Sequence, residues 1–255
     1  MSVIPLHQDA GATVSVPPGL REDLMKIRTR TAALDTKGFL EFVLTEAFKG
    51  RIAVVSSFAA ESVVLLHQVA EIDPTTAVLF LNTGKLFGET LRYRDRLQNV
   101  LGLTDIRAIG PHPNDRRQFD PEGTLWSRNP DACCHFRKVV PLSRAVEGFA
   151  ATITGRKRFQ TTMRATMERV ELVEGRFRIN PLVDWSLEAL AAYVEDKGLP
   201  KHPLVLDGYP SIGCMPCTRR VGAGQGYRDG RWAGFDKDEC GIHGPAQAGT
   251  DGDGI

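Results

Sequence analysis

Short apolar runs alternate along the chain with stretches in which apolar residues recur at helical spacing. Continuous apolar runs of this kind predict strands that are buried on both faces of a sheet. Such runs lie within residues 51–56, 77–81, 105–109 and 151–154. Between the first two runs, Val63, Leu66 and Ala70 follow the helical period, and further helices are expected at 87–100 and after a cysteine pair at 133–134. This alternation predicts an α/β fold built on a mostly parallel, doubly wound sheet.

The regions that flank this pattern have a different character. Two short helices are expected over residues 22–48, and a helix at 186–197 precedes a loop and a second cysteine pair. The first residues are rich in Gly, Pro and Ala, and residues 244–255 are rich in Gly, so both ends are expected to be disordered. We therefore predict a disordered N-terminus at 1–18, one α/β domain at 19–220 and a mobile C-terminal tail at 221–255.

Small polar residues follow three of the predicted strands, at 56–57, 82–84 and 154–156. The ligand crevice of an open α/β sheet lies beyond the carboxyl ends of its strands, so these residues are expected to share one site. Residues 56–62 lead from the first strand to the N-terminus of a helix, where free backbone N–H groups can bind a phosphate or sulfate. The alternative is an ordinary capped turn, because serine is a common helix cap.

Composition and charge narrow the classes of ligand. The 255 residues are 42% hydrophobic and 25% charged, with a formal net charge of +1, which suits one globular core and argues against a general nucleic-acid binder. A small anionic ligand fits better. No apolar run approaches the roughly 18–20 residues that cross a bilayer, and the N-terminus lacks the pattern of a secretory leader. We expect a cytoplasmic protein with no membrane or nucleic-acid partner.

Five cysteines divide into a group of four and a single one. Cys133 and Cys134 are adjacent, Cys214 and Cys217 form a Cys-x-x-Cys pair, and Cys240 lies near the C-terminus. In a reducing compartment this pattern indicates metal binding or catalysis. Four thiolates complete the ligand set of an iron–sulfur cluster or of a structural zinc. The adjacent pair departs from the two Cys-x-x-Cys knuckles of a zinc ribbon, which favours a cluster; buried cysteines without a ligand are a third alternative.

Basic residues accompany both groups of cysteines. Arg137 and Lys138 follow the adjacent pair by one helical turn and are candidates to balance an anionic cluster, with a solvated helix face as the alternative. Cys240 is close in sequence to Arg231, Lys237 and His243, which can favour the thiolate over the thiol. A free thiol on a mobile tail is the alternative for Cys240.

Four segments in order resemble the assimilatory adenylyl-sulfate (APS) reductases of the phosphoadenylyl-sulfate (PAPS) reductase family. They are residues 133–138 (CCHFRK), 180–185 (NPLVDW), 208–219 (GYPSIGCMPCTR) and 239–243 (ECGIH). The resemblance covers roughly residues 45–243. It implies a Rossmann-like nucleotide α-hydrolase fold (adenine nucleotide alpha hydrolase-like) with a cysteine-bearing C-terminal segment.

The same resemblance implies a ligand set and a substrate site. A [4Fe-4S] cluster would be bound by Cys133, Cys134, Cys214 and Cys217. Cys240 would be the catalytic nucleophile. Substrate contacts are implied for residues of the phosphate loop, for a lysine beside the cluster, for an arginine-rich loop and for the tail: Ser56, Ser57, Phe58, Ser62, Lys138, Arg158, Arg164, Arg228, Arg231 and His243.

The reaction implied by the resemblance is attack of the Cys240 thiolate on the sulfur of adenylyl sulfate. AMP leaves, an S-sulfocysteine forms, and thioredoxin or glutaredoxin then releases sulfite. We also expect a homo-oligomer. The alternatives are a reductase of the 3′-phosphorylated substrate, an ATP-dependent adenylating enzyme of the same fold, and, from another class, a zinc-stapled nucleic-acid-binding protein. An adenylating enzyme would need a glycine-rich phosphate loop, and residues 57–62 of this sequence do not supply one.

Overall fold

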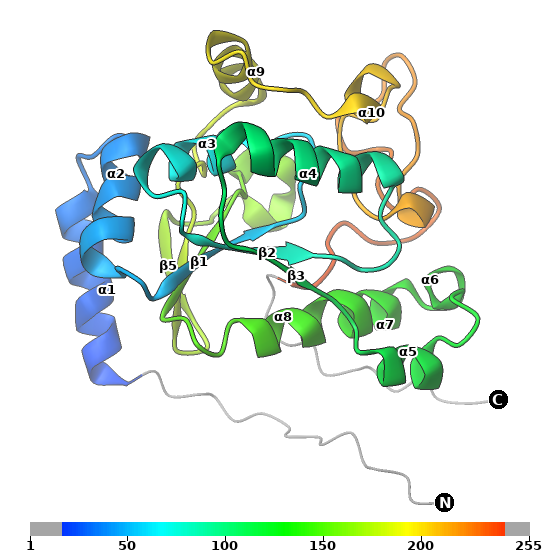
Figure 1. The fold of residues 1–255 in the computed structure, drawn as a ribbon, viewed down its shortest axis with the longest axis horizontal. Coiled ribbons are helices and arrows are strands. Elements are labelled where there is room, and N and C mark those ends of the chain that lie inside the picture. The colour runs from blue at the N-terminus through cyan, green and yellow to red at the C-terminus, as the bar shows by residue number, and fades with distance from the viewer. Residues whose placement is uncertain (1–16, 243–255) are drawn as a thin grey trace, which may run out of the picture.

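The fold is organised around one six-stranded sheet, seen in a computed structural model that describes residues 17–242. The strand order is β3-β2-β1-β4-β6-β5, and every neighbouring pair is parallel except β5 and β6 (Figure 1). This confirms the predicted mostly parallel sheet. The strands are β1 (Ile52–Ser56), β2 (Ala77–Leu81), β3 (Ile106–Ile109), β4 (Ala151–Thr154), β5 (Val170–Val173) and β6 (Arg176–Ile179).

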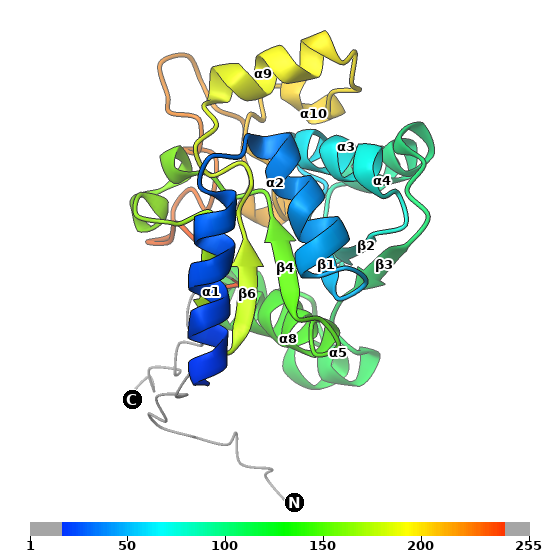
Figure 2. The same ribbon diagram turned by 90° about the vertical axis from the view of Figure 1, so that its left-hand side faces the viewer.

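Helices cover both faces of the sheet. In Figure 1, α2, α3, α4, α9 and α10 lie above the strands, and α5 to α8 lie below them. Helix α1 runs along the edge of the sheet (Figure 2), where Nη2 of Arg28 donates to the carbonyl of Val170 in the edge strand β5 at 2.8 Å. The helices are α1 (Pro18–Thr31), α2 (Thr36–Phe42), α3 (Ser62–Ile72), α4 (Gly88–Leu101), α5 (Pro113–Phe119), α6 (Leu125–Arg128), α7 (Pro130–Cys134), α8 (Val140–Ala145), α9 (Leu187–Asp196) and α10 (Pro203–Leu206). Among residues 17–242, no helix has the length and apolar character to cross a membrane.

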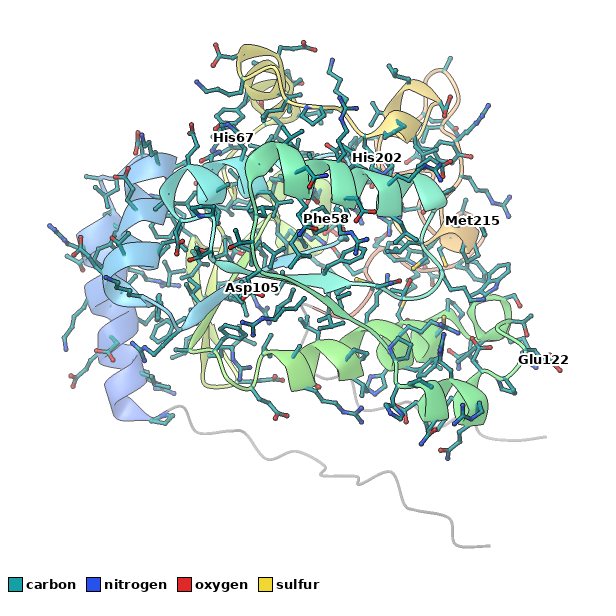
Figure 3. All side chains as sticks on the ribbon, viewed as in Figure 1. Phe58, His67, Asp105, Glu122, His202 and Met215 are labelled. Carbon is teal, nitrogen blue, oxygen red and sulfur yellow. The ribbon has the colours of Figure 1, made fainter. Side chains whose placement is uncertain are left out.

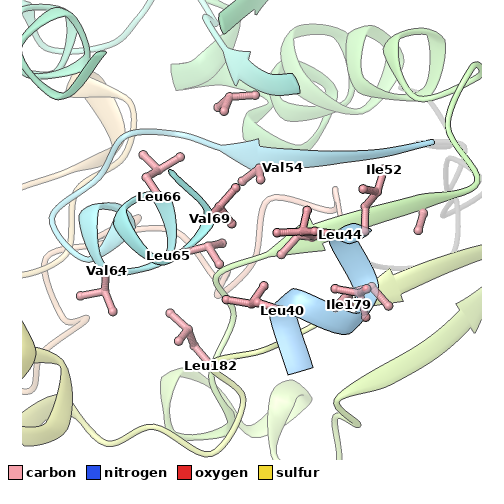
Figure 4. Close-up of a cluster of buried hydrophobic side chains, with 14 of the residues drawn as sticks. Leu40, Leu44, Ile52, Val54, Val64, Leu65, Leu66, Val69, Ile179 and Leu182 are labelled. Carbon is pink, nitrogen blue, oxygen red and sulfur yellow. The ribbon is translucent and has the colours of Figure 1, made fainter. Parts of the chain in front are cut away.

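Two apolar clusters separate these layers from the sheet. The larger one joins Val54 of β1 and Ile179 of β6 to α2 and α3, and Figure 4 shows Leu40, Leu44 and Val69 meeting there. The smaller one joins alternate residues of the central strands, such as Ala53 and Leu79, to α8. Because β1 and β2 are apolar on both faces, each supplies both clusters, which is why they read as continuous apolar runs.

The hairpin of β5 and β6 was not expected from the sequence. Each strand has four residues and carries charged side chains between its apolar ones. Glu174 and Gly175 form a two-residue connection in which both have positive φ, 50° and 74°. This matches the type I′ turn of a tight hairpin. Alternating polarity on both sides of Glu-Gly was the signal in the sequence.

Two predicted boundaries need correction. The helix expected after the cysteine pair is present but begins before it: the pair ends α7, and the helix continues through a π-helical turn, His135–Val139, into α8. At the N-terminus, Pro18 is the first residue of α1 rather than the last of a disordered segment, because proline suits the first helical turn. Residues 1–16 and 243–255, including most of the predicted disordered ends, lie outside the described residues.

Candidate active site

A cavity of about 190 Å³ lies beyond the carboxyl ends of β1, β2 and β4. This is the edge at which three strand ends were predicted to meet. The C-terminal segment forms its opposite wall, and in Figure 1 the orange and red chain passes beside the ends of the strands. The cavity brings together eight of the predicted catalytic and substrate-binding residues and one predicted cluster ligand, Cys214. The eight are Ser56, Ser57, Ser62, Lys138, Arg164, Arg228, Arg231 and Cys240.

The wall of the cavity is strongly basic. Six basic side chains line it against two acidic ones, Glu61 and Glu239. Burial, followed by the nearby charges of Arg231 and Arg164, holds the pKa of Arg228 below its usual range. Burial and the neighbouring Arg178 lower the pKa of Arg156 to about 10. Like charges held together out of water favour an anion between them, so the cavity has the electrostatics of an anion-binding site.

The phosphate loop at 56–62 enters this cavity without a capping side chain. The hydroxyl of Ser56 accepts a bond from the N–H of Phe58 at 3.1 Å, and α3 begins with no side-chain cap. The alternative of an ordinary capped turn is therefore not what forms. In the first turn of α3 the N–H groups of Ser62 and Val64 donate to backbone carbonyls at 3.0 and 3.3 Å, and no side chain caps the helix. The positive end of the helix dipole therefore faces the cavity without a capping side chain, which suits an anionic group there.

Phe58 lies away from the cavity. Its side chain is fully buried and packs edge-to-face on Phe80 with the ring centroids 5.2 Å apart. Figure 3 shows it between the α3–α4 layer and the sheet. An apolar ring gains more from the core than from a basic cavity, so the side chain of Phe58, predicted as a substrate contact, does not line the cavity.

Arg158 also lies outside the cavity. Its Nε donates to the carbonyl of Met167 at 2.8 Å, and its Nη1 pairs with Asp184. The backbone of residue 158 is bonded to Val183, which turns this side chain toward the start of α9. The neighbours of Arg158 in the same loop, Arg156 and Lys157, line the cavity instead.

The four cysteines expected to bind a cluster come from two distant segments that the fold places together. Cys133, Cys134 and Cys214 are buried and Cys217 is half-buried. Burial raises the pKa of Cys133 to about 11 and that of Cys134 to about 12, and it also raises the pKa of Cys217. Among residues 17–242, no three His, Cys, Asp or Glu side chains are grouped as ligands of one metal ion. A four-iron cluster divides its thiolates among its irons, so that finding concerns single-ion sites.

Hydrogen-bond donors surround the cysteine group. Thr83 places its hydroxyl 3.2 Å from the sulfur of Cys214. Arg137 is buried, donates to the carbonyl of Thr83 at 2.8 Å and pairs with Asp120 at 2.6 Å. Arg137 is thus not part of a solvated helix face. It ties the helix that carries one cysteine pair to the loop that contacts the other.

Three buried donors near these residues have no partner within the described part of the chain. They are Nε of Arg137, Nε of Arg231 and Nε1 of Trp232. The backbone N–H of Trp232, unlike its indole N–H, does have a partner: it donates to the carbonyl of Cys217 in the second cysteine pair at 2.9 Å. A buried donor without an acceptor is costly. The three unpaired donors and the four thiols therefore fit an anionic group that is bound by the four cysteines.

Lys138 connects the cysteine group with the cavity. Burial alone would lower its pKa, but the sulfurs of Cys214, Cys240 and Cys134 outweigh burial and raise it. A charged ammonium between the four thiols expected to bind a cluster and the thiol of Cys240 is suited to balance negative charge on either side.

The C-terminal segment lies against the domain up to Ile242. Glu239 pairs with Arg164 at 2.6 Å and accepts from the hydroxyl of Thr161 at 3.0 Å. Ile242 packs on the small apolar cluster beside α8. These contacts hold Cys240 in the wall of the cavity. The mobility expected for this tail stays a prediction, and His243 lies outside the described residues.

Sequence reasoning missed several residues of the site. Glu61, Lys157 and Tyr227 line the cavity together, and Glu239 lies in the same wall as Cys240, which it precedes in the chain. Lys157 could have been found, because it stands next to the predicted contact Arg158 in the basic loop. The two glutamates could not have been found, because an acidic residue is not expected in an anion-binding site unless its basic partners are known.

Comparisons with known proteins agree with this geometry. Residues 51–220 match the family model of the phosphoadenosine phosphosulfate reductase domain. A protein from Mesorhizobium japonicum named adenosine 5′-phosphosulfate reductase is 52% identical over 198 residues, 78% of each chain.

Two solved structures are similar in fold. A phosphoadenylyl-sulfate reductase from Candida auris, in a phosphate complex, superposes with a TM-score of 0.66 at 21% identity, over 79% of this chain and 97% of that one. An FMN adenylyltransferase from Candida glabrata, bound to FMN and an ATP analogue, gives a TM-score of 0.51 at 12% identity, over 81% and 74%. The predicted nucleotide α-hydrolase fold is thereby confirmed.

Proposed function

The chain belongs to the phosphoadenosine phosphosulfate reductase family, and on that premise we propose that it reduces adenosine 5′-phosphosulfate to sulfite and AMP in sulfate assimilation. The relatives named for this substrate support the choice, since they match three quarters of the chain at up to 52% identity. The observation that carries the proposal is the position of Cys240 in one cavity with six basic side chains.

Cys240 would act as the nucleophile. Its thiolate attacks the substrate's sulfur, a sulfur–sulfur bond forms, and the bond from sulfur to the phosphate oxygen breaks, so that AMP leaves with its electron pair. The substrate carries negative charge on both sides of that bond. Lys138, Arg164, Arg228 and Arg231 would neutralise it, which lowers the barrier to attack by an anion.

A dithiol protein such as thioredoxin or glutaredoxin would complete the cycle. One of its thiolates attacks the Cys240 sulfur, sulfite leaves, and the second thiol resolves the mixed disulfide, so the partner is oxidised by two electrons. A cytoplasmic location would supply this reductant and keep the five cysteines reduced. We also expect a homo-oligomer.

The cofactor would be a [4Fe-4S] cluster bound by Cys133, Cys134, Cys214 and Cys217. When bound, such a cluster supplies negative charge and fixed geometry beside the substrate. Lys138 would stand between that charge and the substrate, and the unpaired donors of Arg137 and Trp232 would find acceptors. No electron transfer by the cluster is needed for the steps above.

The experiment is sulfite release by anaerobically purified protein with thioredoxin, run on adenylyl sulfate and on its 3′-phosphorylated form. Strong preference for the unphosphorylated substrate is expected. Preference for the phosphorylated one would assign the other reductase activity of the family, and no release from either would contradict the proposal.

The role of Cys240 has a test of its own. We predict that Cys240→Ser binds AMP as the unchanged protein does, but forms no sulfonated adduct with adenylyl sulfate. Intact mass measured without reductant reads the adduct directly. An adduct that persists on this variant would show that another residue is the nucleophile.

A further inference from the structure

Glu61 occupies a junction of three segments in the cavity wall. It lies at the end of the phosphate loop, where α3 begins. Its carboxylate accepts from Nζ of Lys157, from Nε2 of Gln160 at 2.9 Å and from the hydroxyl of Tyr227. Lys157 and Gln160 follow β4, and Tyr227 belongs to the C-terminal segment. One side chain thus joins the phosphate loop, the basic loop and the tail.

The junction is largely closed to water. The Glu61 side chain is 14% exposed and that of Lys157 is 2% exposed. A carboxylate and an ammonium buried together neutralise each other, and removing one leaves the other unpaired at considerable cost. Lys157 is therefore committed to Glu61. In the same wall Arg156 pairs with Glu171 and Arg164 with Glu239, so the tail arginines and Lys138 are the basic side chains most available to a substrate anion.

Tyr227 links this junction to the tail arginines. Residues 222–226 before it form an exposed loop, and Arg228 and Arg231 follow it in the cavity wall. The Tyr227 ring packs edge-to-face near Phe159 with centroids 6.0 Å apart. Its hydroxyl contacts the Glu61 carboxylate and the side chain of Ser211, which anchors the point at which the chain re-enters the site.

We propose that Glu61 is a positioning residue that holds the tail arginines in the substrate site through Tyr227. It touches no reacting atom. Its carboxylate fixes Tyr227, and Tyr227 fixes the direction of Arg228 and Arg231 before the substrate arrives. Preorganisation of this kind lowers the cost of binding. Its loss is therefore expected to raise KM and to leave kcat nearly unchanged. The proposal rests on the proposed function for its kinetic test alone.

The test uses Tyr227→Phe, which removes the hydroxyl but keeps the ring and its packing. KM for adenylyl sulfate is expected to rise about tenfold, as for a lost hydrogen bond to a charged group, with kcat within about twofold. Hydrogen exchange of peptides covering 226–242 is expected to speed up in the free protein. Asp236→Asn, an exposed change in the same segment, is the matched control and leaves both unchanged.

A second variant assigns the effect to Glu61. Glu61→Ala, which leaves no acceptor, should raise KM at least as much, and Glu61→Ala with Tyr227→Phe should be no worse than Glu61→Ala alone, because the hydroxyl of Tyr227 has then already lost this acceptor. Fully additive effects, or unchanged exchange in Tyr227→Phe, would overturn the proposal. Exchange is read without substrate, so a protein that proves inactive on adenylyl sulfate would refute the proposed function and still test this junction.

Discussion

Gly213 lies directly against the guanidinium of Arg231. A Cβ at residue 213 would stand 2.4 Å from Nη2 and 2.6 Å from Cζ of Arg231. Contacts this short are not tolerated, and the group that must move is the end of a flexible side chain rather than backbone. A methyl at this position would therefore displace Arg231 while leaving the fold intact.

We predict that Gly213→Ala raises KM for adenylyl sulfate at least tenfold, because an arginine expected to bind the substrate anion moves away. The melting temperature is expected to change by only a few degrees. Gly148→Ala is the matched control, since a Cβ there meets nothing within 4 Å. Equal KM values for the two variants would contradict the placement of Arg231 in the substrate site.

The C-terminal segment is held to the basic loop by the ion pair of Glu239 and Arg164. The pair is mostly shielded from water, with side chains 16% and 13% exposed. Glu239 precedes Cys240, and both line the cavity. A substrate anion that binds Arg164 would compete with Glu239 for the same guanidinium. The contact that docks the segment is thus one that the substrate can replace.

We predict that Glu239→Gln loosens this segment in the free protein, because a neutral amide pairs weakly with Arg164. The rate at which iodoacetamide alkylates Cys240 should rise several-fold, read by peptide mass, and added AMP should change it less than in the unaltered protein. Asp238→Asn, an exposed neighbour, serves as the control. An unchanged alkylation rate in Glu239→Gln would show that the ion pair does not restrain Cys240.

The elements that sequence predicted best are those whose pattern is set by burial on both faces. The predicted 77–81 and 151–154 coincide with β2 and β4, because buried parallel strands need continuous apolar residues. The β5–β6 hairpin was missed because its strands are short and carry arginine and glutamate. The continuation of α7 through a π turn was missed because it depends on packing around the cysteine pair.

At the scale of the whole molecule, the site assembles from segments more than 150 residues apart in sequence, from Ser56 to Cys240. Strand-end positions predicted that the loops after β1, β2 and β4 converge, whereas the placement of Cys240 beside them followed only from the resemblance to the reductase family. The partners that neutralise charges within the wall were not predictable, because Glu61 and Lys157 meet only once the β1 and β4 loops are folded. Arg158 shows the reverse: a basic residue in the right loop whose side chain turns to Asp184 instead.

The layer of helices above the sheet depends on a buried histidine that joins α4 to α10. His202 is fully buried, its Nδ1 accepts from the N–H of Leu204 at 3.2 Å, and its Nε2 lies 3.0 Å from the hydroxyl of Thr90. Figure 3 places it in that upper layer. Since Nδ1 is an acceptor, the neutral ring carries its proton on Nε2, and protonation of Nδ1 would break the bond to Leu204.

Burial lowers the pKa of His202 from its ordinary 6.5 to about 4. Between these values the unfolded chain binds the extra proton and the folded chain does not. The free energy of unfolding is therefore expected to be unaffected by this group above pH 6.5 and to fall as the pH drops toward 4, by up to about 3 kcal/mol. His202→Asn keeps an acceptor for the N–H of Leu204 and removes the titratable imidazole. Urea unfolding at several pH values should show a shallower decline for the variant, although it starts from lower stability at pH 7. Parallel declines would mean that folding does not change the pKa of His202.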